Sequence, residues 1–130
     1  MIEIVEDHPS LRTDVARLQR RLEAALAGEG REAGDVTVVL AARADVLDLN
    51  RAYLDHDYAT DVLSFWLGAD DGSGPVEGEV YVDLDTAQER CVEFGATFDD
   101  EVARYALHGL LHLCGYDDAT PELKIGRAHV

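Results

Sequence analysis

Two histidines near the C-terminus have the spacing of metal ligands. His108 and His112 lie four residues apart in the apolar string HGLLHLCGYDD. Side chains at positions i and i+4 share one helix face, about 5–6 Å apart at Cβ, so two imidazoles can reach one cation. Gly115 then offers a left-handed end to the helix, and the turn after it can bring Asp118 back towards the two rings. The segment therefore predicts a Zn²⁺ site of two histidines and one carboxylate.

Three protein ligands would leave one coordination position for water, which is the arrangement of catalytic zinc sites rather than structural ones. A zinc peptidase is disfavoured, because Gly109 stands where the HExxH motif has its catalytic glutamate. The alternative is purely structural, since a histidine in an apolar helix is more often a core residue than a ligand. For Cys91 and Cys114, which lack a CxxC spacing, we expect free buried thiols.

The charge of the chain argues against broad affinity for nucleic acid. The formal net charge is −16 at pH 7, and phosphate backbones are bound mainly through Lys and Arg. Four arginines nevertheless crowd the first predicted helix, at positions 12, 17, 20 and 21. They predict either a local basic strip or an ordinary solvated helix face whose charges have partners on the protein.

Length and hydropathy favour one domain in an aqueous compartment. A chain of 130 residues can bury a core without disulfides. No apolar run approaches the length of about 20 residues that spans a bilayer, and the N-terminus MIEIVEDHPS lacks the form of a signal peptide. We therefore expect a soluble, cytoplasmic protein without membrane contact.

Hydrophobic periodicity predicts the elements that position the histidines. Strands are expected at about 2–5, 36–41 and 61–66, and a fourth is expected in the string EVYVDL. This fourth strand follows the loop GADDGSGPVEG and should pair antiparallel with the strand before that loop. Helices are expected at about 10–27, 45–54 and 86–94, and a last one, capped by Thr97, runs to Leu113 and carries both histidines. This order predicts an α+β fold with a mixed, mostly four-stranded sheet packed by helices.

Several motifs in order resemble one family. LNRAY at 49–53, TDVLSF at 60–65, GEVYVD after them and HGLLHLCGYD at 108–117 are similar to the YbeY family of endoribonucleases. The resemblance covers about residues 1–122. It implies a zincin-like, metal-dependent protein acting on single strands in 16S rRNA 3′-end maturation and in quality control of the small ribosomal subunit. It also implies ribosomal RNA and the small subunit as partners, together with ribosomal proteins or assembly GTPases.

The resemblance assigns His108 and His112 to the first two metal ligands of the family. It also exposes two departures from the family pattern. The third family ligand is a histidine where this chain has Asp118, and an aspartate can bind Zn²⁺ but brings a negative charge that weakens the Lewis acid. The family arginine that follows the tyrosine of LNxxY is replaced by Leu54. Arg51, one helical turn back, is the candidate to hold a phosphate in its place.

The resemblance also places Thr60 and Asp61 near the metal cleft, where they could position water or a ribose hydroxyl. Asp61, Asp117 and the metal-bound hydroxide itself are the candidate bases, because HGLLH supplies no glutamate. The alternative is that Thr60 and Asp61 cap the turn into the strand. Ser64 is expected to pack beneath the sheet.

Two functions from different classes remain. The leading one is a zinc-dependent endoribonuclease, and the alternative is a non-catalytic ribosome-assembly binding module with a structural or vestigial metal site. We expect residues 1–123 to form a single, C-terminally truncated domain. The last residues, KIGRAHV at 124–130, are expected to be a non-native tail.

Overall fold

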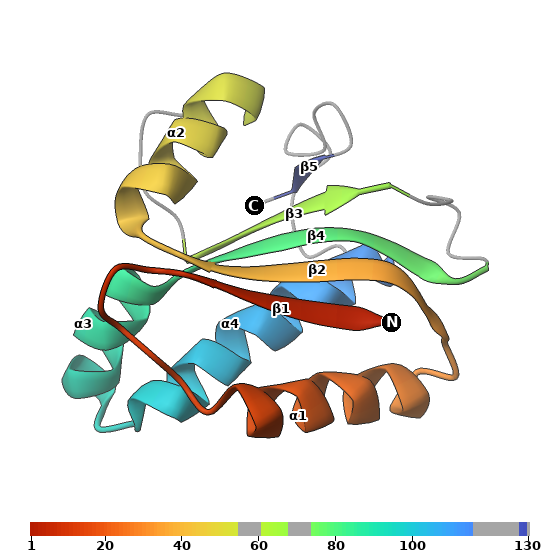
Figure 1. The fold of residues 1–130 in the computed structure, drawn as a ribbon, viewed down its shortest axis with the longest axis horizontal. Helices are drawn as coiled ribbons and strands as arrows, with labels where there is room; N and C mark the ends of the chain where they lie inside the picture. Colours follow the sequence, from red (N-terminus) through yellow and green to blue (C-terminus); the bar gives the residue numbers. More distant parts are fainter. Residues whose placement is uncertain (55–60, 68–73, 116–127, 130) are drawn as a thin grey trace.

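A computed structural model describes residues 1–54, 61–67, 74–115 and 128–129 of the chain (Figure 1). Strands and helices follow one another along the sequence, and within these ranges four helices pack on a mixed sheet in an α+β fold. In chain order they are β1 (Ile2–Asp7), α1 (Val15–Gly28), β2 (Ala33–Ala41), α2 (Arg43–Leu54), β3 (Val62–Trp66), β4 (Val76–Asp83), α3 (Leu84–Phe94), α4 (Phe98–Leu113) and β5 (Ala128–His129).

The strands form one mixed sheet in the order β1-β2-β4-β3-β5. β1 runs parallel to β2 and β2 runs parallel to β4. β3 runs antiparallel to β4, with Val62 opposite Val82 and Trp66 opposite Gly78. The antiparallel pairing predicted from the loop between these two strands is therefore confirmed. β5 adds two residues to the free side of β3, opposite Ser64 and Phe65.

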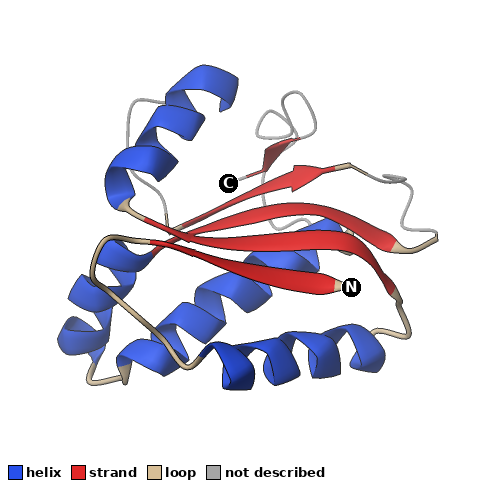
Figure 2. Cartoon of the chain, in the orientation of Figure 1, coloured by secondary structure: helices blue, strands red, loops and turns tan. Residues whose placement is uncertain are grey.

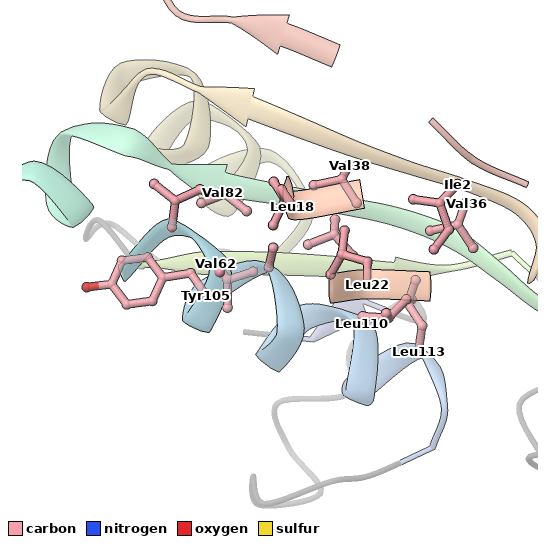
Figure 3. Packing of buried hydrophobic residues seen from close by; sticks show 14 of the residues in the cluster. Ile2, Leu18, Leu22, Val36, Val38, Val62, Val82, Tyr105, Leu110 and Leu113 are labelled. Carbon is pink, nitrogen blue, oxygen red and sulfur yellow. The ribbon is translucent and has the colours of Figure 1, made fainter. Parts of the chain in front are cut away.

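The two faces of the sheet are covered unequally. Of the helices that the structure describes, α1, α3 and α4 lie against one face and α2 lies against the other (Figures 1 and 2). Because side chains alternate along a strand, residues such as Val36, Val38 and Leu40 of β2 point to the three helices and are almost completely buried. Figure 3 shows this core, in which leucines of α1 and α4 meet the strand valines.

Some predicted boundaries were wrong because local hydrogen bonds compete with the helix. The first helix begins at Val15 rather than near Ser10: Asp14 is the N-cap and accepts a hydrogen bond from the Arg17 amide at 3.1 Å. The amides of Ser10 and Leu11 instead donate to Nδ1 of His8, at 3.1 and 3.0 Å. The His8 side chain thereby keeps the segment just before α1 as a loop.

Other predicted boundaries were too short. β1 extends to Asp7, β2 begins at Ala33, and α2 begins at Arg43. β4 begins at Val76, so the end of the string read as a loop belongs to the strand. Both cysteines are free and buried, as expected. Within the described ranges, no helix is long and apolar enough to cross a membrane.

Candidate metal centre

Helix α4 is well specified at both ends, which is why it can position a site. The Thr97 side chain accepts a hydrogen bond from the Asp100 amide at 3.1 Å and caps the first turn, as predicted. Asp99, Asp100 and Glu101 place negative charge at the positive end of the helix dipole. At the other end Gly115 has a φ of 103°, a left-handed conformation that ends the helix where the sequence predicts.

The two predicted ligand histidines lie side by side on α4. The ring centroids of His108 and His112 are 4.2 Å apart, with an angle of 65° between the ring planes. His112 is 2% exposed, and Nε2 of His108 and Nδ1 of His112 are shielded from solvent. The rings of two imidazoles on adjacent turns of one helix thus lie close enough together to share a cation.

Gly109, between the two histidines, is the point at which α4 touches the sheet. A Cβ atom at this position would lie 2.5 Å from Cγ1 of Val80 and 2.8 Å from Cγ2 of Val62. The Ser64 hydroxyl also donates to the Gly109 carbonyl oxygen at 3.1 Å. No side chain fits here, so the glutamate of a zinc peptidase could not be accommodated. Ser64 is fully buried and packs beneath the sheet, as expected.

Asp61 lies at the start of β3, close to the turn of α4 that precedes His108. Its carbonyl oxygen accepts a hydrogen bond from the Asp83 amide at 3.0 Å, and its side chain is half-buried. The pKa of Tyr105 is raised to about 12, mainly by burial and by Glu101, and the negative charge of Asp61 adds to this rise. The structure therefore brings Asp61 near the histidine-bearing face of α4.

Glu101 belongs to the same face of α4 and was not singled out from the sequence. It is 4% exposed and accepts hydrogen bonds from the Tyr105 hydroxyl at 3.0 Å and from Nε and Nη2 of Arg104 at 3.0 and 3.1 Å. Residues 101, 105, 108 and 112 share one helical stripe by their spacing. That spacing is the signal in the sequence that could have pointed to Glu101. The role of Glu101 in holding the Tyr105 hydroxyl depends on burial, which the sequence does not give.

Arg51 is not on the same side of the sheet as the histidines. It is exposed in the last turn of α2, and α2 lies against the face opposite α4 (Figure 1). Thr60, Asp117 and Asp118 fall outside the described residues, as does the side chain of Leu54. The remaining half of the predicted site therefore stays a prediction.

Two arginines of α1, and Arg12 just before it, have partners on the protein. Arg17 and Arg21 approach the Asp100 carboxylate, at 3.7 and 3.0 Å. Hydrogen bonding from Arg21 and Thr97 lowers the pKa of Asp100. Arg12 donates to the His8 carbonyl oxygen at 2.8 Å. These contacts favour the solvated helix face with charged partners over a free basic strip.

The donor chemistry of the histidine pair fits a zinc ion. Two imidazoles with one carboxylate form a known type of catalytic zinc site. Within the described ranges, no three His, Cys, Asp or Glu side chains cluster as a complete ligand set. A third ligand would have to come from outside the described residues, where Asp118 is the predicted one.

Comparison with known proteins places this geometry in a family. The family model described as Endoribonuclease YbeY matches residues 4–126. The Endoribonuclease YbeY of Salinibacter ruber is 48% identical over 126 residues, which cover 92% of this chain and 80% of that protein. The one of Chlorobaculum parvum is 40% identical over 112 residues, with 86% and 77% covered.

A solved structure gives the same result for the fold. The solution structure of TM1509 from Thermotoga maritima matches with a TM-score of 0.63 and 32% identity, over 92% of this chain and 75% of that one. Family match, relatives and fold agree over most of the sequence. The chain therefore belongs to the Endoribonuclease YbeY family.

Proposed function

We propose that this chain is an endoribonuclease that uses zinc to cleave single-stranded RNA in the cytoplasm. Its role would be 3′-end maturation of 16S ribosomal RNA and quality control of the small ribosomal subunit. The observation that carries this proposal is the pair of imidazoles on α4, with ring centroids 4.2 Å apart, of which His112 is buried and His108 is half-buried. The names of the relatives, which are endoribonucleases, support RNA as the substrate.

His108, His112 and Asp118 would hold the ion. When bound, zinc supplies Lewis acidity, which polarises a phosphoryl oxygen and makes water more acidic. An aspartate as third ligand lowers the net charge of such a centre compared with a third neutral imidazole. We therefore expect a weaker Lewis acid than a three-histidine site provides.

Asp61 is the residue proposed to accept the proton of the attacking nucleophile. Its carboxylate lies near the Tyr105 phenol, whose pKa of about 12 keeps it protonated at neutral pH. The Tyr105 hydroxyl donates its hydrogen bond to Glu101. Because this bond uses the one hydroxyl hydrogen of Tyr105, the Asp61 carboxylate is left to accept the proton of the nucleophile. Thr60, the neighbour of Asp61, would position the nucleophile.

Arg51 would hold a phosphate of the bound strand. Since α2 and α4 lie on opposite faces of the sheet (Figure 1), one RNA can reach both helices only by passing around an edge of the sheet. Arg51 is thus suited to a phosphate some distance from the scissile one. Its contribution would be to substrate affinity rather than to the developing charge.

Removal of a histidine tests the proposal. Purified full-length protein should contain about one zinc per chain by elemental analysis and should cleave single-stranded fragments of 16S rRNA until a chelator is added. His112→Ala should lose both zinc and cleavage. Leu113→Ala removes a buried neighbour, 4% exposed, and controls for loss of packing: it should be less stable but retain zinc. Equal cleavage by wild type and His112→Ala would refute a metal-dependent reaction.

The alternative, a non-catalytic ribosome-assembly module, has specific support in the net charge of −16 and in Leu54, which replaces the family arginine. Such a module would contact the small subunit, ribosomal proteins or assembly GTPases without cutting RNA. Zinc absent from protein purified in its presence, together with retained binding to the small subunit, would favour the module over the enzyme.

A further inference from the structure

A second recessed surface lies on the face of the sheet opposite α4. It is a pocket of about 180 Å³ between α2 and the pair β3 and β4. Its walls are mostly aromatic and aliphatic, and they come from three segments of the chain. The lining residues, called the aromatic pocket below, are Leu49, Tyr53, Phe65, Leu67, Glu79 and Tyr81.

The three aromatic rings of this pocket hold one another in a defined arrangement. The Phe65 ring meets the Tyr53 ring edge-to-face, with centroids 5.4 Å apart and planes at 77°. It meets the Tyr81 ring in the same way on another side, at 5.9 Å and 88°. Tyr53 is 59% exposed and Leu67 is 66% exposed. Ring surface that is held in place and open to solvent can stack on a flat ligand without an ordering cost.

The aromatic pocket has one charged lining residue, Glu79. Glu79 is half-buried, and its Oε1 accepts a hydrogen bond from the Tyr81 hydroxyl at 3.1 Å. Burial and the neighbouring Glu79 raise the pKa of Tyr81 to about 12. The phenol therefore keeps its proton, and the carboxylate stays an acceptor with further capacity for N–H donors.

These features select one part of an RNA strand. A carboxylate repels phosphate groups, but it accepts hydrogen bonds from the N–H groups at the edge of a base. Stacking on aromatic side chains serves the flat face of the same base. Guanine matches best, since its Watson–Crick edge offers neighbouring N–H donors, whereas uracil offers one.

We propose that the aromatic pocket binds a single unpaired base of the RNA substrate, with a preference for guanine. The proposal rests on the proposed function in taking RNA as the ligand. The pocket is linked to the metal centre through β3: Ser64 contacts Gly109 between the two histidines, and the next residue, Phe65, lines the pocket on the other face. The bound base would belong to the part of the strand that reaches the α2 face, some distance from the cleavage position, as for the phosphate assigned to Arg51.

Binding of short RNAs in the presence of a chelator tests this without cleavage. The probes are two labelled RNA nonamers of uridine, one with a central guanosine and one with a central abasic site. Fluorescence anisotropy should give wild type an affinity about tenfold higher for the guanosine strand. Tyr53→Ala should remove most of that difference and leave the affinity for the abasic strand unchanged. Phe94→Ala, which truncates a ring that is 64% exposed on α3, is the matched control and should change neither.

Glu79→Gln separates base recognition from simple stacking. The guanosine preference should fall about fivefold, because the amide presents one acceptor and an unfavourable donor. Affinity for the abasic strand should stay the same or rise, because one repelling charge is removed. A uniform loss on both strands in Tyr53→Ala, or no guanosine preference in wild type, would overturn the pocket assignment.

The two proposals fail in different ways. Wild type that binds the guanosine strand through Tyr53 but does not cut RNA with zinc present keeps the pocket and removes the nuclease. Cleavage that depends on His112, together with a Tyr53→Ala variant that binds both strands like wild type, keeps the nuclease and removes the pocket. Absence of any binding to either strand overturns both.

Discussion

The two faces of the sheet differ in how completely helices cover them. The well-covered face provides stability, and the less covered face leaves side chains exposed for recognition. The face under α1, α3 and α4 is filled by side chains such as Leu22, Val38 and Leu110, all essentially without exposure. The opposite face has α2 over β3 and β4, and there Tyr53 keeps 59% of its surface exposed. The closed face carries the helix with the histidine pair, and the open face leaves an aromatic surface available.

The largest effect is expected on the closed face. Leu110→Ala removes a fully buried side chain of α4 and should lower the free energy of unfolding by about 2–5 kcal/mol. Urea unfolding followed by circular dichroism measures this. A loss below about 1 kcal/mol would mean that the closed face relaxes around the cavity and is less tightly packed than its burial implies.

The contact of α4 with the sheet gives the next effect. Gly109→Ala places a methyl group 2.5 Å from Val80 Cγ1 and should cost about 1–3 kcal/mol of stability, although alanine favours helices. Zinc affinity should fall as well, because the neighbouring histidines shift with the backbone. Gly28→Ala, at a helical glycine with no atom within 4 Å of the added Cβ, is the control and should be neutral or slightly stabilising. Similar losses in both variants would refute the close approach.

Asp85 links the segment before α1 to the start of α2, and we expect it to make the stability of the fold depend on pH. Its Oδ1 contacts Nε2 of His8, before α1, at 3.1 Å, and its Oδ2 accepts from the Arg43 amide, at the start of α2, at 2.9 Å. Burial raises the pKa of Asp85, but the hydrogen bonds from Arg43 and His8 outweigh burial, so the pKa is lowered overall. A carboxyl group with a lowered pKa in the folded state stabilises the protein above its unfolded pKa.

Asp85→Asn should therefore cost about 1 kcal/mol near neutral pH. The difference from wild type should shrink as the pH falls below about 4, where the carboxyl group of the unfolded chain becomes protonated, and vanish below the folded pKa. Urea unfolding of both proteins from pH 3 to pH 7 checks the sign. A difference that grows towards acid pH would contradict it.

The smallest effect is expected on the open face. Tyr53→Ala should change the free energy of unfolding by only about 0.5 kcal/mol, the value of one exposed aromatic contact. Thermal unfolding of the same samples used for RNA binding provides the measurement. A loss as large as that of Leu110→Ala would mean that the pocket is part of the core and would erase the contrast between the faces.

Local patterns predicted the elements but not all of their limits. The apolar spacing in α4, the Thr97 cap and Gly115 are signals read within a few residues, and they placed the histidine helix correctly. The start of α1 was missed because His8 captures two backbone amides that would otherwise begin the helix. That competition depends on a side chain held by Asp85, which is distant in the sequence.

The sequence by itself determined that two imidazoles share one helix face, since the helical repeat alone sets that relation. It also determined that the strand with TDVLSF pairs antiparallel with the next strand, through a short loop. Only the tertiary structure decided that β4 lies between β2 and β3, that α2 faces away from α4, and that Leu49, Phe65 and Tyr81 line one pocket. The physical reason is that burial and strand order arise from contacts between distant segments, and no local period encodes which segments will meet.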